Sequence, residues 1–171
     1  MRDTDGEYVE YVRARLPALR RAAWHLCGDP HRGDDLVQQT LIRLHLYWRR
    51  AAAADNTDAY VHRILTRVFL DERRLHWARV LLLGRTPAPT HEPVPDAGDG
   101  ADDRAVLRAA LATLPPRTRL VLVLRFVADR SVDEVAEILG CRPGTVKSQT
   151  ARALAALRTI LGEQADDLER I

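Results

Sequence analysis

Apolar residues recur at intervals of three and four along most of the chain, the spacing of amphipathic helices. In the first part they predict a helix over residues 7–26, in which Pro17 is expected to cause a kink or a break. The Cys27-Gly-Asp-Pro stretch predicts a stop and a turn. Further helices are predicted over 34–50 and 59–79, the latter capped by Asn56, Thr57 or Asp58.

The second part of the chain has the same periodicity with clearer boundaries. Helices are predicted over 106–114 and 117–127, separated by Pro115-Pro116. Ser131-Val-Asp-Glu134 has the form of a capping box and opens a predicted helix over 131–139. Gly140 is placed to end that helix, and Pro143 suits the first turn of the next one, over 143–158.

Between these parts the periodicity disappears. Residues 86–101 contain four prolines and two glycines, a composition typical of an extended or flexible linker. The prediction is an all-α protein with two small helical domains. Residues 1–85 form a helical bundle, 86–103 a flexible acidic linker, and 104–171 a domain with a helix-turn-helix.

Composition excludes several classes of protein. The hydrophobic fraction of 46% is too high for wholesale disorder, and no apolar stretch is long enough to cross a membrane. The N-terminus lacks the pattern of a secretory signal. Cys27 and Cys141 are far apart and have no metal-ligand spacing, so we expect free cysteines, no metal, no cofactor and a cytoplasmic protein. The six histidines are scattered without a catalytic constellation, which argues against an enzyme.

The formal net charge of +2 conceals a strong pattern along the chain. Net charge is +4 over residues 60–85, −5 over 86–103, +4 over 114–158 and −3 over 159–171. Two separate basic blocks are typical of a protein that contacts a polyanion at two places, although ordinary solvated helix faces also account for them. A further hypothesis is that the acidic linker or tail competes with DNA for the basic surfaces.

The helices predicted over 131–139 and 143–158, joined by a short turn with Gly140, form a helix-turn-helix pattern. On a helical wheel, Val146 and Ala153 face inward. Small, hydrogen-bonding and basic residues face outward near the start of the second helix, as in helices that enter the major groove. A plain helical hairpin would share the inner pattern but not this outer face, so DNA binding is favoured.

These segments resemble a known family. Leu114-Pro-Pro-Arg-Thr-Arg-Leu-Val-Leu-Val-Leu-Arg125, Ser131–Gly140 and Gly144–Leu154 are similar to region 4 of bacterial sigma factors. Gly33-Asp-Asp-Leu-Val-Gln-Gln-Thr-Leu-Ile-Arg-Leu44 resembles the helix of region 2 that binds core RNA polymerase, and Ala59–Arg74 the adjoining −10 helix. The resemblance is to the extracytoplasmic-function (ECF) group, the group-4 type of the sigma-70 family. The chain is rich in Arg and Ala, which is typical of a GC-rich genome, and an actinobacterial protein is expected.

The resemblance implies three sets of binding residues. Residues on the second predicted helix would bind core polymerase: Asp34, Asp35, Leu36, Gln38, Gln39, Ile42 and Arg43. A simpler explanation for Asp34 and Asp35 is that they lie in the first turn of a helix, where acidic side chains interact favourably with the helix dipole. The −10 element would be contacted by Asp55, Asn56, Arg63, Arg67, Arg73, Arg74 and Trp77. Trp77 fits base stacking and a core position equally well.

The third set would read the −35 element and comprises Arg142, Thr145, Lys147, Ser148, Gln149 and Arg152. The family commonly has arginine at position 149, and glutamine there favours adenine over guanine. Arg67 replaces an expected asparagine, and Glu72 adds a negative charge to the −10 segment. The implied function is a sigma factor whose partners are core RNA polymerase, promoter DNA and an anti-sigma factor. The alternative is an autonomous helix-turn-helix regulator that binds duplex DNA without polymerase.

Overall fold

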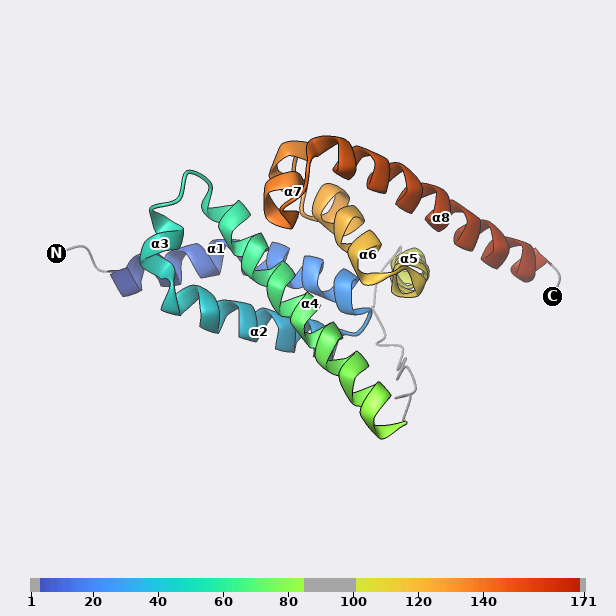
Figure 1. Ribbon diagram of the computed structural model, residues 1–171, viewed down its shortest axis with the longest axis horizontal. Coiled ribbons are helices and arrows are strands. Elements are labelled where there is room, and N and C mark those ends of the chain that lie inside the picture. Colours follow the sequence, from blue (N-terminus) through green and yellow to red (C-terminus); the bar gives the residue numbers. More distant parts are fainter. Residues whose placement is uncertain (1–3, 85–100, 170–171) are drawn as a thin grey trace.

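The computed structural model describes residues 4–84 and 101–169 (Figure 1). The first half contains α1 (Thr4–Cys27), α2 (Pro30–Leu46), α3 (Trp48–Ala52) and α4 (Thr57–Leu83). The second half contains α5 (Ala101–Thr113), α6 (Pro116–Leu122), the π-helical turn η1 (Val123–Val127), α7 (Val132–Leu139) and α8 (Pro143–Glu169). No strand occurs in these described ranges, which confirms the all-α prediction.

Side chains define the helix ends much as the sequence predicts. The Asp29 carboxylate accepts a hydrogen bond from the His31 amide at the start of α2, and the Asn56 side chain caps α4. Both hydrogen bonds of the Ser131–Glu134 capping box are present. Gly140 ends α7 with a φ of 65°, in the left-handed region that glycine enters without a Cβ penalty.

Several predicted boundaries differ from the structure. The helices predicted over 106–114 and 143–158 are longer, at Ala101–Thr113 and Pro143–Glu169. The predicted break at Pro17 does not occur, because the turns after it bury Leu19, Ala22, Ala23 and Leu26, and this packing outweighs one lost hydrogen bond. The helix predicted over 34–50 begins earlier, at Pro30, and is divided between α2 and α3. The helix predicted over 117–127 changes to π geometry at Val123. Most of the predicted linker lies outside the described residues, and its last three residues belong to α5.

The helices of the first half pack closely around a buried core. At Gly33, an added Cβ would lie 2.3 Å from Cδ1 of Trp24 and 3.1 Å from its backbone, so only glycine permits this approach of α2 to α1. Leu36 and Leu44 on α2 and Leu65 and Phe69 on α4 are almost completely buried in the same core.

The two halves also pack against each other. Leu120 and Val123 of the second half belong to the core formed by α1, α2 and α4, while Ala59 of α4 packs in a cluster with Leu124 and Val135. In Figure 1, α6 and α7 lie beside α4 and α1, whereas the C-terminal part of α8 extends away from them. We call this arrangement the closed form.

A buried arginine joins the halves at the centre of the closed form, and we call its hydrogen bonds the Arg119 latch. The Arg119 guanidinium donates to the carbonyl oxygens of Leu26 at 2.5 Å, Ala112 at 2.8 Å and Leu114 at 3.0 Å. Leu26 lies near the end of α1 and Ala112 near the end of α5, where carbonyls lack helical partners. Burial lowers the pKa of Arg119 to about 10, which still leaves it charged at neutral pH.

Candidate functional site

One side of α2 presents polar and apolar residues to solvent together. These residues recur at helical spacing, and we call them the α2 face: Asp35, Gln38, Gln39, Ile42, Arg43 and Leu46. Ile42 is 56% exposed and Leu46 72% exposed, although both could be buried by a partner. Exposed aliphatic side chains surrounded by polar ones are typical of a protein-binding surface.

Two members of the predicted polymerase-binding set have other surroundings. Leu36 is completely buried in the core, so its side chain anchors α2 and is not part of a surface. Asp34 accepts two hydrogen bonds from Arg20, at 3.0 and 3.1 Å, and one from Trp24 Nε1 at 3.1 Å. Arg20 lowers the pKa of Asp34. Because α2 begins at Pro30, neither Asp34 nor Asp35 lies in its first turn, and the helix-dipole explanation does not hold.

The predicted polymerase-binding set does not include Leu46 and Tyr47. Both are apolar, exposed residues at the C-terminal end of α2. Leu46 lies four residues after Ile42 and therefore on the same side of α2. Tyr47 is 48% exposed in the turn between α2 and α3. The signal that would have found Leu46 was its i+4 spacing from Ile42.

On α4 the predicted −10 residues divide into two groups. At about 100° per residue, four of them fall within roughly 80° of one another, and we call them the α4 face: Arg63, Arg67, Arg74 and Trp77. Trp77 is 61% exposed, so it is not a core residue. Arg73 lies at the edge of this face, half-buried, with its guanidinium 5.4 Å from the centre of the Phe69 ring. Burial lowers the pKa of Arg73.

The beginning of α4 is in contact with two carboxylates of α7. Asn56 donates from Nδ2 to Glu134 Oε1 at 2.7 Å, and Arg63 donates from Nη2 to Glu137 Oε1 at 2.8 Å. Asp55 is exposed in the preceding loop. Sequence reasoning did not find this contact, because nothing in the local pattern of α7 indicates that its outer carboxylates meet α4.

The helix-turn-helix forms as predicted. Val146 and Ala153 of α8 are completely buried, and Val146 packs with Val135 and Ile138 of α7. The predicted −35 residues lie on the first turns of α8 and in the turn before it, and we call this set the α8 face: Arg142, Thr145, Lys147, Ser148, Gln149 and Arg152. Four of them are exposed, whereas Thr145 and Gln149 are half-buried at the edges of the face. Ser148 Oγ donates to the Thr145 carbonyl, which is a local contact within the helix. The charged members of the α8 face pair with no carboxylate in the described part of the chain.

Other chemistry is not indicated in the described residues. No group of three or more His, Cys, Asp or Glu residues lies close enough there to hold a metal ion. Cys27 is buried, which raises its pKa to about 11, and Cys141 is partly exposed; both thiols are free. Among the helices described, none has the length and apolar character needed to span a membrane.

Two family models match this chain, each over one of the halves. The model described as sigma-70 region 2 matches residues 11–79, and the model described as sigma-70, region 4 matches residues 104–157. The first match covers the α2 and α4 faces, and the second covers the helix-turn-helix. Both regions therefore occur in the order that the resemblance predicted, which does not favour an autonomous regulator.

Similar proteins agree with these matches. The RNA polymerase sigma-E factor of Streptomyces coelicolor is 38% identical over 89% of this chain and 84% of its own length. That of Streptomyces avermitilis is 40% identical over 89% and 83%. The ECF RNA polymerase sigma factor EcfG of Rhodopseudomonas palustris is 33% identical over 88% and 82%.

Together the fold and these matches define an RNA polymerase sigma factor. The chain belongs to the ECF group of the sigma-70 family and functions as a transcription initiation factor that directs RNA polymerase. A solved structure of the sigma factor RpoE from Bartonella quintana, in complex with the anti-sigma factor NepR, has a TM-score of 0.73 and 26% identity, covering 91% of this chain and 97% of that one. CnrH, in complex with the cytosolic domain of CnrY, shares the fold with a TM-score of 0.63 and 22% identity, covering 91% and 88%.

Proposed function

We propose that the chain binds core RNA polymerase through the α2 face and positions two DNA-reading surfaces on it. The exposed aliphatic pair Ile42 and Leu46 would supply the apolar centre of the contact, and the polar residues around them its rim. Asp34 would act indirectly, because its bonds to Arg20 and Trp24 fix α2 against α1.

The α4 face would hold the −10 element. Arg63, Arg67 and Arg74 supply cations for phosphates, and exposed Trp77 supplies a flat surface on which an unpaired base can stack. Asp55 and Asn56, at the loop before α4, would contact an extruded base. Arg73 would contribute positive potential more than a direct contact, because it is half-buried against Phe69.

The α8 face would read the −35 element in the major groove. Lys147, Arg152 and the hydroxyl residues can hold phosphates, and Gln149 can form paired hydrogen bonds with adenine. The observation that carries the whole proposal is the occurrence on one chain of the exposed α2 face, the cationic α4 face and a complete helix-turn-helix. Each of these features by itself has a simpler explanation.

The closed form cannot perform this function unchanged. Asn56 and Arg63 are engaged by Glu134 and Glu137, so promoter reading requires the two halves to separate at this contact. We infer a cytoplasmic, non-catalytic factor that binds promoter DNA weakly alone and strongly on polymerase. Its control by an anti-sigma factor is supported by the complex in which RpoE was solved with the anti-sigma factor NepR.

Run-off transcription with core RNA polymerase on genomic fragments, followed by mapping of start sites, tests the proposal. The expected result is initiation at a set of promoters that share −10 and −35 elements, and its loss in the variant Ile42→Glu. Val9→Glu, at an exposed apolar position on α1, is the matched control and should retain activity. If the protein fails to bind core polymerase in a pull-down and instead binds duplex DNA as a dimer, the autonomous regulator is correct.

A further inference from the structure

The last turns of α4 expose four leucines that no proposed binding surface uses. They are 60–83% exposed, and we call the segment that carries them, residues 75–83, the α4 tip: Leu75, Leu81, Leu82 and Leu83. In Figure 1 this end of α4 projects beyond the other helices. A single exposed leucine is ordinary, whereas four of them within one short segment form a patch of the kind that marks a binding surface.

The apolar residues at the end of the α4 tip face every side of the helix. Residues 80–83 read Val-Leu-Leu-Leu, and at about 100° per residue they are spread around the whole circumference. A groove on a protein partner covers one side of a helix and would leave part of this turn in water. A turn that is apolar on all sides is matched by a medium that surrounds it, such as the acyl region of a lipid layer.

The α4 tip carries cations and no carboxylate. Arg79 is exposed within it, and Arg74 is exposed directly before it. The nearest acidic residue on α4 is Glu72, about 16 Å from Leu83 along the helix axis. Because the Debye length at physiological ionic strength is about 8 Å, the carboxylates of α4 do not cancel the positive potential at the end of the helix. The patch is therefore complementary to a surface that is both anionic and apolar.

Trp77 adds a further indication of a lipid surface. It is 61% exposed and precedes Leu83 by six residues, a rise of about 9 Å. Helices that bind membrane surfaces bury apolar side chains about 5–10 Å into the boundary between headgroups and acyl chains, and tryptophan and arginine are enriched at that boundary. With the leucines among the acyl chains, Trp77 and Arg79 would lie at the level of the headgroups.

The end of the helix limits the depth of such a contact. The Gly84 N–H donates to the Val80 carbonyl oxygen at 3.0 Å, but the last carbonyls of a helix have no partner within it. Unpaired carbonyls are costly in hydrocarbon, so the α4 tip would stay at the hydrated boundary. The expected contact is shallow and reversible.

We propose that the α4 tip binds the surface of a membrane that contains anionic lipids, with Leu81, Leu82 and Leu83 among the acyl chains and Arg74 and Arg79 at lipid phosphates. Binding to lipid is independent of the proposed function. Its consequence rests on that function, because Arg74 and Trp77 belong to the α4 face. A chain bound to lipid would not present this face to the −10 element.

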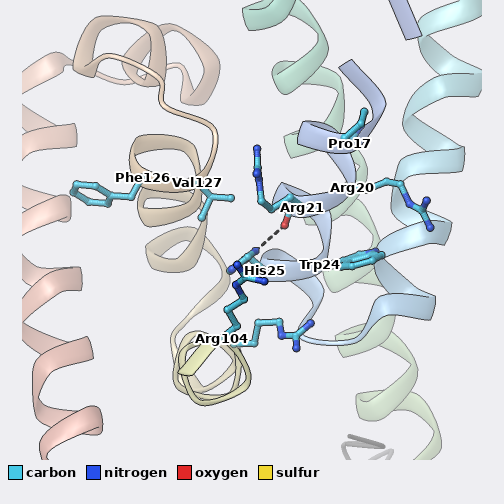
Figure 2. A pocket seen from close by; sticks show the side chains of 9 residues that line it. Pro17, Arg20, Arg21, Trp24, His25, Arg104, Phe126 and Val127 are labelled. Carbon is cyan, nitrogen blue, oxygen red and sulfur yellow. Dashed lines mark hydrogen bonds between the residues drawn. The ribbon is translucent and has the colours of Figure 1, made fainter. Parts of the chain in front are cut away.

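Another group of cations, with an exposed aromatic residue, provides matched controls. Figure 2 shows Arg21 of α1 and Arg104 of α5 at a cleft between these helices, with Phe126 pointing away from them. Phe126 is 58% exposed. Because the ring and the cations face different directions and the cleft is concave, a flat lipid surface cannot contact them together.

Flotation of the full-length protein with lipid vesicles, in the absence of polymerase, tests the proposal. The vesicles contain phosphatidylcholine alone or phosphatidylcholine with an equal amount of phosphatidylglycerol, and we expect binding to the anionic vesicles only. Joint Leu81→Ser and Leu82→Ser substitution should weaken binding at least about tenfold, because it removes apolar side chains from the contact. Joint Arg74→Gln and Arg79→Gln substitution should weaken it about tenfold.

The matched controls distinguish this contact from general attraction to a basic protein. Phe126→Ser, and separately Arg21→Gln with Arg104→Gln, should leave binding within about twofold. Circular dichroism verifies that each variant folds.

Trp77 reports its own position. Of the three tryptophans, Trp48 is buried and Trp24 donates to Asp34, so a change in emission on binding belongs to Trp77. Anionic vesicles should shift the emission to shorter wavelengths, and brominated acyl chains should quench it. Trp77→Phe should lose both responses.

Several outcomes would overturn the proposal: equal losses in the tip and control variants, equal binding to uncharged vesicles, or an unchanged Trp77 emission. Self-association that the leucine variant abolishes in sedimentation would assign the α4 tip to a second copy of the chain. Loss of core-polymerase binding in that variant would assign it to polymerase. Failure of the proposed function would be seen separately, as absent run-off transcription by the wild type.

Discussion

The α4 face and the α8 face are both cationic helix surfaces, yet the structure treats them differently. The first residues of the α4 region are bonded to carboxylates of α7, whereas the charged residues of the α8 face have no carboxylate partner in the described chain. One cation of the α4 face is therefore paired with the protein's own carboxylate, whereas the cations of the α8 face are all available.

The difference follows from how each surface is built. The α8 face is supported mainly by its own half, because Val146 packs with Val135 and Ile138 and Ala153 packs with Leu111 and Leu114, although Ala59 of α4 also belongs to the cluster around Val146. The beginning of α4 lies where the two halves meet, and Ala59 is buried among residues of the second half. The −35 residues are therefore accessible to DNA whether or not the two halves are packed together. Access to the −10 residues depends on how the halves are packed.

The largest effect is expected from Arg119→Met. The substitution leaves three carbonyl oxygens without their shared donor and should lower the free energy of unfolding by about 3 kcal/mol. Arg117→Met, at an exposed neighbouring position, should change it by less than about 0.5 kcal/mol. Chemical denaturation measures both. If Arg119→Met unfolds with the wild-type midpoint, the latch does not stabilise the closed form.

The second prediction concerns the α8 face alone. Gln149→Arg should move the base preference at one −35 position from adenine to guanine, a change of about 1–3 kcal/mol in discrimination. Run-off transcription on paired promoters that differ at single −35 positions measures it. Arg152→Ala should instead weaken all the promoters by a similar factor. An unchanged preference in Gln149→Arg would remove Gln149 from the base-reading set.

The third prediction would make the two surfaces alike. Glu137→Arg removes the partner of Arg63 and places a cation opposite it, so the free protein should bind a single-stranded −10 oligonucleotide about threefold to tenfold more tightly. Asp133→Arg adds the same charge to α7 at an exposed position that has no ion pair with α4, and it measures the effect of charge alone. Equal gains in both variants would contradict a specific masking contact.

The smallest effect is a pH dependence from His62 on α4. Burial lowers the pKa of His62, and the nearby charge of Arg130 adds to this shift. The hydrogen bond to the Asp58 carbonyl and the negative charges of Asp58 and Glu134 oppose it. The unfolded chain therefore takes up the proton more readily as pH falls below about 6.5, and the folded state loses stability. Relative to His62→Gln, the wild type should lose up to about 1 kcal/mol between pH 7.5 and 5.5.

His25 provides the internal check on this result, because its pKa is lowered as well. Part of the pH dependence should therefore persist in His62→Gln and disappear in the variant that also has His25→Gln. Urea denaturation at each pH measures the free energy of unfolding. A wild type and a His62→Gln variant with parallel pH profiles would show that His62 does not couple protonation to folding.

The features that are visible in the sequence are those that depend on neighbouring residues. The Ser131–Glu134 capping box and the Gly140 stop depend on residues close in sequence, and both were correctly predicted. For α4 the sequence left three candidate caps, and the structure shows Asn56 in that role. The inward positions of α8 follow from periodicity alone. Lys147, Ser148 and Arg152 of the α8 face are exposed for the same reason, whereas Thr145 and Gln149 are half-buried at its edges.

Features that depend on distant residues were not predictable in this way. Pro17 continues a helix because packing later in α1 compensates for it. The contacts of Asn56 and Arg63 with α7 join residues more than seventy positions apart. No local pattern records which carboxylate meets which cation once the halves have packed.

The Arg119 latch differs from the ion pairs around it in the groups that water must solvate when the halves separate. Its partners are neutral carbonyls, so separating the halves leaves no unpaired carboxylate, and only water is needed to solvate the Leu26 oxygen and the freed guanidinium. Opening at this point is therefore a hydration step. Added salt would weaken the Arg63–Glu137 pair but affect the latch little, whereas excluded osmolytes such as sucrose would hold it closed.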